Sequence, residues 1–244
     1  MGMMTSLRRL SKKRPVLGVL FVVVLSIGLI GSYAIFASPK ATVATPETQA
    51  PAADAAQQAE AMQKAAQEQI SQLETEISNL QKELQAKPND VATILKLGDN
   101  QYHLGTMYLF VNSDQAKATA SFKEAVNSYQ QVLKLNPQEK GIYLRLAGAA
   151  LYAGDEKLAE DNFQAAIKAD PEDNNARLSY GMYLASMKGD FQGAIDQWQE
   201  ILKHNPDKDL ADQVREMIKQ AEAAKQQASQ AGNSPPQAGG EQGK

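Results

Sequence analysis

Apolar residues recur at helical spacing along most of this chain. One apolar stripe lies between residues 70 and 84, another between 210 and 221, and in each the apolar positions are mainly three and four residues apart. This spacing places apolar side chains on one face of a helix. Helix-forming residues dominate and β-branched runs are rare outside the N-terminal region, so the pattern predicts an all-α protein.

One segment departs from this amphipathic pattern. Val16 to Ala37 is a run of 22 residues without a charge. As a helix it would span about 33 Å, which matches a bilayer core of roughly 30 Å. We therefore predict a transmembrane helix at residues 16–37.

The charges before this segment predict its orientation. Residues 1–15 contain Arg8, Arg9, Lys12, Lys13 and Arg14 and no acidic residue, so the positive-inside rule assigns them to the cytoplasm. The rest of the chain would then be extracytoplasmic, attached to the cell membrane by a single pass. A cleaved signal peptide is the alternative, because Ser32-Tyr33-Ala34 places small residues near the end of the apolar run.

A spacer and a long helix are predicted next. Residues 38–54 contain three prolines among Ala and Thr, which favours an extended linker. Residues 55–87 are rich in Ala, Gln and Glu and carry heptad a and d positions at Ile70, Leu73, Ile77, Leu80 and Leu84. Ile at a with Leu at d favours a parallel two-stranded coiled coil and hence a homodimer. The alternative is that this stripe packs on the next helix of the same chain as an N-terminal cap.

The remaining chain repeats. Pro137 and Pro171 are 34 residues apart and Pro206 follows 35 later. The copy before Pro171 has large residues, small residues and a turn in an order that its neighbours share: Tyr143, Leu146-Ala147, Gly154-Asp155, Ala159, Phe163 and Ala166. The last copy reads Tyr180-Gly181, Gly189-Asp190, Ala194, Trp198 and Ile201, with one extra residue near Ser186-Met187.

The first copy is longer than the others. It contains Leu97-Gly98, Tyr102, Phe122 and Tyr129, but 49 residues separate Pro88 from Pro137, which leaves about 15 more than one repeat. The insert runs from Thr106 to roughly Ala120 and is broken at Asn112-Ser113-Asp114. We predict that both helices of this copy grow by about two turns and that Asp114 caps the second.

These motifs resemble the tetratricopeptide repeat (TPR) family over residues 90–206. The resemblance implies an α-solenoid of three helix pairs, at about 90–137, 138–171 and 172–206, whose first helices line a concave groove for peptides or helices. We expect a capping helix at 208–228 to complete a TPR domain at 90–228, because terminal repeats need a solvated outer face. Residues 229–244 are rich in Gly, Pro, Ser and Gln and predict a disordered tail.

The inner wall of that groove is predicted from position within each repeat. It includes Leu95, Asp99, Tyr102, Leu144, Leu151, Tyr152, Leu178 and Met182. This wall is mostly apolar, with Lys96 and Arg145 near its edge, so we expect an amphipathic helix or apolar segment as partner. Alternatively, the C-terminal helix or a neighbouring molecule covers it.

A second candidate contact lies in the insert. Met107, Tyr108 and Phe110 belong to a run of five large apolar residues that a two-turn extension would leave half exposed. Packing against the helix at 55–87 is the alternative.

Other kinds of site find little support. The chain has no cysteine, which removes disulfides and Cys-based zinc sites, and its two histidines lie on different repeats. Beyond residue 15 it carries 28 acidic and 20 basic residues, a net charge of about −8 that disfavours nucleic acid. We expect no metal, no cofactor and no enzymatic activity.

The sequence therefore predicts a bacterial, membrane-anchored, extracytoplasmic TPR adaptor that binds a partner protein. Two alternatives are a chaperone of apocytochrome and a coiled-coil scaffold of the envelope. The first rests on Gly193 to Trp198, Leu202 and Asn205-Pro206, which are similar to the end of the TPR domains in cytochrome c maturation proteins.

Overall fold

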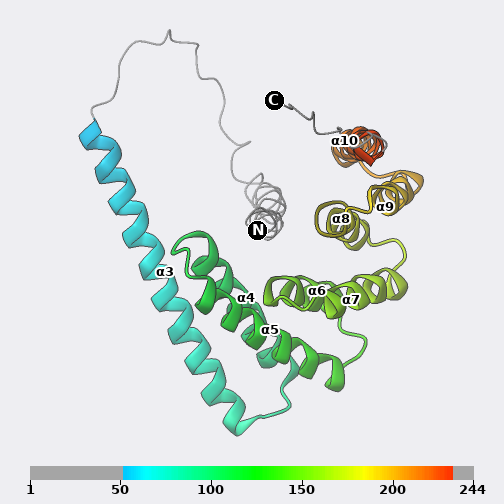
Figure 1. Ribbon diagram of the computed structural model, residues 1–244. Helices are drawn as coiled ribbons and strands as arrows, with labels where there is room; N and C mark the ends of the chain where they lie inside the picture. The colour runs from blue at the N-terminus through cyan, green and yellow to red at the C-terminus, as the bar shows by residue number, and fades with distance from the viewer. Residues whose placement is uncertain (1–51, 233–244) are drawn as a thin grey trace, which may run out of the picture. The chain divides into compact units, whose positions relative to one another are not determined.

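Helices make up the described part of the chain. The computed structural model describes residues 52–232, and no strand occurs among them (Figure 1). These residues divide between Pro171 and Glu172 into two compact units. The predicted all-α class is confirmed for this part.

The first unit, residues 52–171, holds five helices that pack in chain order. They are α3 (Ala52–Ala86), α4 (Val91–Phe110), α5 (Gln115–Leu135), α6 (Ile142–Ala153) and α7 (Glu156–Ala169). Each helix contacts the next, and α3 lies alongside α4 (Figure 1). Because α3 starts at Ala52, the last three residues of the predicted linker are helical.

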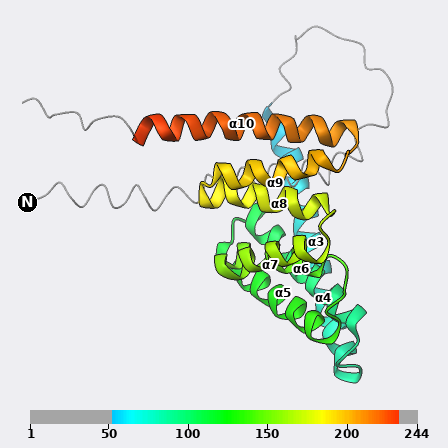
Figure 2. The same cartoon turned by 90° about the vertical axis from the view of Figure 1, so that its right-hand side faces the viewer.

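The second unit, residues 172–232, is a smaller helical stack. It comprises α8 (Asn174–Tyr183), the π-helical turn η2 (Leu184–Lys188), α9 (Phe191–Lys203) and α10 (Lys208–Gly232). The helix α9 packs between α8 and α10 (Figure 2). Val214 and Ala221 of α10 are buried. The helix continues to Gly232, past residue 229 where the sequence predicts the tail.

Aspartate is the N-cap residue of five helices in the described part of the chain. The side chains of Asp90, Asp114, Asp155, Asp173 and Asp190 each accept a hydrogen bond from a backbone N–H in the first turn that follows. These bonds pair donors that a helix start leaves without an intrahelical acceptor. The predicted cap at Asp114 is thereby confirmed, with its Oδ1 3.0 Å from the amide nitrogen of Lys117.

The insert lengthens the first helix pair as predicted. The helices α4 and α5 have 20 and 21 residues, whereas α6 and α7 have 12 and 14. The differences of 8 and 7 residues account for the 15 predicted from the proline spacing. A short turn separates α4 from α5, and Ser113 in it has a φ of +52°.

The extra residue of the last copy has a local explanation. Residues 184–188 form the π-helical turn that continues α8. A π turn places one more residue in a helical turn than an α turn does, so the residue is absorbed without breaking the helix. Gly189, with a φ of +67°, then ends the segment, as Gly154 with a φ of +86° ends α6.

Glycines allow aromatic rings to approach the first helix of two copies. A Cβ atom at Gly105 would lie 2.9 Å from the ring of Phe122, and one at Gly181 would lie within 2.8 Å of three atoms of the Trp198 indole. In the second unit, Ile201 of α9 is fully buried.

The apolar stripe of α3 faces inward. Ile70, Leu73 and Leu80 are buried, and Ile70 and Leu73 form a cluster with Leu104 and Tyr108 of α4. Ile77 and Leu84, the other two positions of the stripe, are half-buried and pack against core clusters of this unit. These side chains are not free to form the seam of a homodimer. The capping-helix alternative describes this stripe and corrects the coiled-coil interpretation.

Several predicted segments lie outside the described residues. These are residues 1–15, the transmembrane segment 16–37, most of the linker and residues 233–244. Within residues 52–232, no helix combines the length and apolar character needed to cross a membrane.

Candidate functional site

Three helices of the first unit meet at Asp99. Its Oδ1 accepts a hydrogen bond from the Tyr129 hydroxyl of α5 at 2.8 Å and pairs with Nη1 of Arg145 of α6 at 2.5 Å. Asp99 lies on α4, and Arg145 follows it by 46 residues. One carboxylate therefore joins the first helix of the long copy to the first helix of the next copy.

Gly98 explains how Tyr129 reaches this carboxylate. The Tyr129 side chain is buried, and a Cβ atom at position 98 would lie 2.7 Å from its ring. The missing side chain lets the ring lie against α4, where the hydroxyl points to Asp99 one residue further on. Burial, followed by the negative charge of Asp99, raises the pKa of Tyr129. The neutral tyrosine is therefore retained as a hydrogen-bond donor.

The same residues line a pocket. A cavity of about 400 Å³ is bordered by Asp99, Tyr102, Tyr129, Leu144, Arg145 and Gly148. Three predicted wall residues, Asp99, Tyr102 and Leu144, come together there. A Cβ atom at Gly148 would lie 3.8 Å from the Tyr102 ring, so this glycine leaves the space beside the ring open.

Aromatic rings support one side of the pocket. The Tyr102 ring lies edge-on to Phe122, with centroids 5.3 Å apart, and to Tyr152 at 6.1 Å. The rings of Phe122 and Tyr152 stack at 4.9 Å. Burial raises the pKa of Tyr102. Tyr152, a predicted wall residue, therefore holds Tyr102 in place and does not itself line the cavity.

Other predicted wall residues occupy different surroundings. Leu95 is half-buried and packs against the core cluster around Ile94, and Leu151 is half-buried on α6. Leu178 of the second unit is buried, and its carbonyl accepts a hydrogen bond from Trp198 Nε1 at 3.3 Å. Met182 is half-buried in the same helix. An accessible position for Leu178 is thus wrong, because its side chain belongs to the core.

The predicted wall was too apolar and omitted several lining residues. Arg145 was predicted near the edge of the wall, but it borders the pocket because it forms an ion pair with Asp99. Tyr129 and Gly148 were missed. The sequence Gly98-Asp99 could have indicated Tyr129. A glycine opposite a tyrosine in a helix pair allows the ring to lie close, and the carboxylate of the next residue can then accept a hydrogen bond from the tyrosine hydroxyl.

The second predicted contact is mostly internal. Tyr108 is buried, its hydroxyl donates to Oε1 of Glu74 on α3 at 2.5 Å, and the Lys117 ammonium lies 5.1 Å from its ring centroid. Burial and the bond to Glu74 raise the pKa of Tyr108 to about 12. Met107 packs against the same cluster, and Phe110, the last residue of α4, is half-buried. The alternative of packing against the helix at 55–87 is therefore correct for Tyr108 and Met107.

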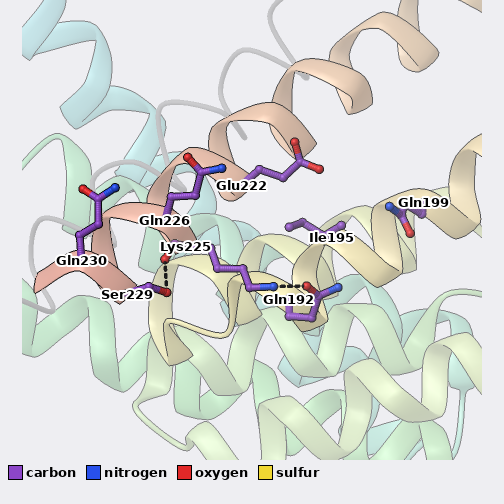
Figure 3. A pocket seen from close by; sticks show the side chains of 8 residues that line it. All are labelled: Gln192, Ile195, Gln199, Glu222, Lys225, Gln226, Ser229 and Gln230. Atoms are coloured by element: carbon purple, nitrogen blue, oxygen red, sulfur yellow. Dashed lines mark hydrogen bonds between the residues drawn. The ribbon is translucent and has the colours of Figure 1, made fainter. Parts of the chain in front are cut away.

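A second cavity lies within the other unit. It has a volume of about 710 Å³ and opens between α9 and α10 (Figure 3). Its lining is largely polar, and Lys225 Nζ donates to Oε1 of Gln192 across it at 2.6 Å. Ile195 is the one apolar residue among those that line it. Gln and Ser side chains dominate this opening.

The described residues contain no cluster of three or more His, Asp or Glu side chains that could hold a metal ion. His103 is exposed on α4, and His204 is half-buried at the end of α9.

The repeats of this chain are similar in sequence to those of known proteins. Residues 144–209 match the family model described as Tetratricopeptide repeat. Tetratricopeptide repeat protein 16 of Macaca fascicularis is 28% identical over 94 residues, 36% of this chain, and the chain covers 11% of its length. The chain thus spans about a tenth of that relative.

Two solved structures are also similar. MamA from Desulfovibrio magneticus RS-1, from residue 41 to its end, aligns with 72% of this chain and 97% of its own, at 18% identity and a TM-score of 0.47. YrrB, titled a TPR protein with an unusual peptide-binding site, aligns with 60% of this chain and 84% of its own, at 19% identity and a TM-score of 0.38. Similarity at this level assigns no function.

Proposed function

Because this chain belongs to the TPR family, we propose that it is an adaptor that binds a partner protein or peptide at the cavity around Asp99. One observation carries the proposal: α4, α5 and α6 together border a single cavity of about 400 Å³ with both apolar and charged walls. That volume lies in the range of roughly 300–1,000 Å³ in which proteins bind small ligands or side chains. We call this cavity the Asp99 pocket.

The Asp99 pocket has the composition of a peptide-binding site. Leu144 and the Tyr102 ring offer apolar contact, and Asp99 and Arg145 offer polar groups that fix orientation. Aromatic residues and arginine contribute much of the binding energy at protein interfaces. An apolar segment of the partner would bury its side chain here, as the sequence pattern predicts.

Photocrosslinking in cells tests this function. A photoreactive phenylalanine analogue replaces Leu144 in the pocket, and in a matched control it replaces Lys123, which is exposed on α5. We expect a defined crosslinked species from position 144 alone, and its loss when Tyr102→Ala is added. The proposal is refuted when both positions give the same species, or when position 144 gives none. Mass spectrometry of the species identifies the partner, and an apocytochrome would favour the cytochrome maturation alternative.

We further propose that residues 16–37 anchor this adaptor in the cell membrane with residues 52–232 on the extracytoplasmic side. The support is the uncharged run and the five basic residues before it. The chain lacks cysteine, so single-cysteine variants report topology without background. Met62→Cys, at a position 74% exposed on α3, should react with a membrane-impermeant maleimide in intact cells. Ser6→Cys should react only after the membrane is permeabilised, and the reverse pattern would contradict the proposed topology.

A further inference from the structure

We infer that the Asp99 pocket selects an electrically neutral peptide group flanked by an apolar side chain, and discriminates against both a carboxylate and an ammonium group. This inference rests on the proposed function, because it specifies which chemical group of the partner enters the pocket.

The pocket contains hydrogen-bond donors and acceptors that are not used within the described residues. A guanidinium has five N–H donors, and that of Arg145 makes a single hydrogen bond within the described residues, to Oδ1 of Asp99. Oδ1 accepts from both Tyr129 and Arg145, whereas Oδ2 accepts from no group in the described part of the chain. The Tyr102 hydroxyl likewise has no hydrogen-bond partner in residues 52–232. A ligand that both donates and accepts is required to use these groups.

The charges of the pocket cancel. Asp99 and Arg145 carry opposite unit charges in direct contact, and their side chains are 38% and 44% exposed. A carboxylate near Arg145 would bring a second negative charge close to Asp99, and an ammonium near Asp99 would bring a second positive charge close to Arg145. Like charges at such separations repel. A peptide group supplies a C=O for Arg145 and an N–H for Asp99 without a net charge.

The free volume suits one residue of a peptide. About 400 Å³ is an order of magnitude more than the roughly 30 Å³ that one water occupies in the liquid. The absent side chain at Gly148 opens the space beside Tyr102, and Leu144 borders it with aliphatic surface. A leucine-sized side chain can therefore lie beside Tyr102 while its peptide group meets Asp99 and Arg145.

Three small probes with one side chain test the selection. They are N-acetyl-L-leucine methylamide, which is neutral, N-acetyl-L-leucine, which is anionic, and L-leucine methylamide, which is cationic at pH 6.5. The full chain is prepared in lipid nanodiscs with labelled leucine methyl groups, and the Leu144 methyl signal is followed by NMR during titration. We expect the neutral probe to bind with a Kd of the order of 1 mM, as its size allows, and at least fivefold more tightly than the charged ones.

Charge-altering variants give a signature that simple damage to the pocket would not give. Asp99→Asn keeps the size of the side chain and leaves Arg145 uncompensated, so the preference should change to the anionic probe. Arg145→Gln leaves Asp99 uncompensated, so the preference should change to the cationic probe. Far-UV circular dichroism verifies that each variant is folded. If a variant fails to fold, the relative affinities of the three probes for the unmodified chain still test the selection of a neutral group.

Each outcome has a separate meaning for the two proposals. A charged probe that binds the unmodified chain as tightly as the neutral one, or no shift of the Leu144 signal with any probe, overturns the selection of a neutral peptide group. A crosslink from position 144 together with either result would leave the adaptor function standing and remove only this inference. Selective probe binding without any crosslink would indicate a small-ligand pocket in place of an adaptor site.

Discussion

Two glycines of the first unit should respond in opposite directions to the same substitution. A Cβ atom at Gly98 would lie 2.7 and 2.9 Å from two atoms of the Tyr129 ring and 3.1 Å from Cβ of Ser128. At Gly148 the nearest atoms, both of Tyr102, are 3.8 Å away, which is an ordinary van der Waals distance. Both glycines lie inside helices, so replacement by alanine offers each the same gain in helix propensity.

The magnitudes follow from these distances. Alanine in place of glycine stabilises a helix interior by up to about 1 kcal/mol. At position 98 the ring must move by roughly 0.7 Å to reach normal contact, and it is surrounded by Ile94, Val132 and Leu146 of one core cluster. Overpacking of this kind costs about 1–3 kcal/mol, and displacement of the ring also weakens its hydrogen bond to Asp99. We expect Gly98→Ala to lower the free energy of unfolding by about 1–2 kcal/mol and Gly148→Ala to raise it by about 0.4–1 kcal/mol.

Urea unfolding measures the difference. The free energy of unfolding of each variant is obtained from circular dichroism at 222 nm, with the unmodified chain measured beside it. Equal m-values would show that the substitutions alter stability and not the extent of unfolding. A Gly98→Ala variant as stable as Gly148→Ala would refute the reasoning, because it would mean that the ring of Tyr129 does not depend on the missing side chain.

Three further predictions concern α3, α4 and the caps. Ile70→Ala should lower the free energy of urea unfolding by about 2–5 kcal/mol, because this side chain of α3 is buried against α4. Met62→Ala, at an exposed position of the same helix, should change it by no more than about 0.5 kcal/mol. Equal effects of the two substitutions would contradict the packing of α3 on α4. Asp155→Ala should lower the free energy of unfolding by about 0.5–2 kcal/mol, because the backbone N–H of Leu158 loses the carboxylate that accepts its hydrogen bond. Asp155→Asn retains an acceptor and should keep most of that stability. Burial and the bond to Glu74 raise the pKa of Tyr108 from its ordinary value of 10.0 to about 12, so the folded state binds this proton more tightly than the unfolded state. The stability that this gives is complete below pH 10 and is lost as the pH rises towards 12. Between pH 9.5 and 11.5 the unmodified chain should therefore lose about 1.5–2 kcal/mol more stability than Tyr108→Phe, and parallel pH profiles would show that Tyr108 is not buried.

Helix ends and the insert were predictable because their causes are local. Asp114 follows a break and precedes a helical run, so the cap can be identified within a few residues of sequence. The proline spacing reports the sum of the two helix extensions, and the structure divides that sum almost equally between α4 and α5. The extra residue near Ser186 was also visible, although the sequence does not reveal that a π turn accommodates it.

The role of the α3 stripe was not decided by its own sequence. Ile and Leu three and four residues apart serve a coiled coil and an intramolecular cap equally well. The deciding partner lies on α4, where Leu104 and Tyr108 form an apolar face that joins Ile70 and Leu73 in one cluster. The insert lengthens α4 and includes Tyr108, so the run that suggested an exposed contact is what receives α3.

The Asp99 pocket shows the same limit for charged residues. Position within a repeat predicted Asp99, Tyr102 and Leu144 on one wall, and these three residues border one pocket. It could not reveal that Asp99 pairs with Arg145, since the two residues lie 46 positions apart and their contact depends on how α4 and α6 are set by α5. Tyr129 makes that setting specific, because its ring requires Gly98 and its hydroxyl fixes the carboxylate. A wall classified as apolar by counting side chains therefore contains a neutral ion pair, and this pair is what gives the pocket a means to choose among ligands of different charge.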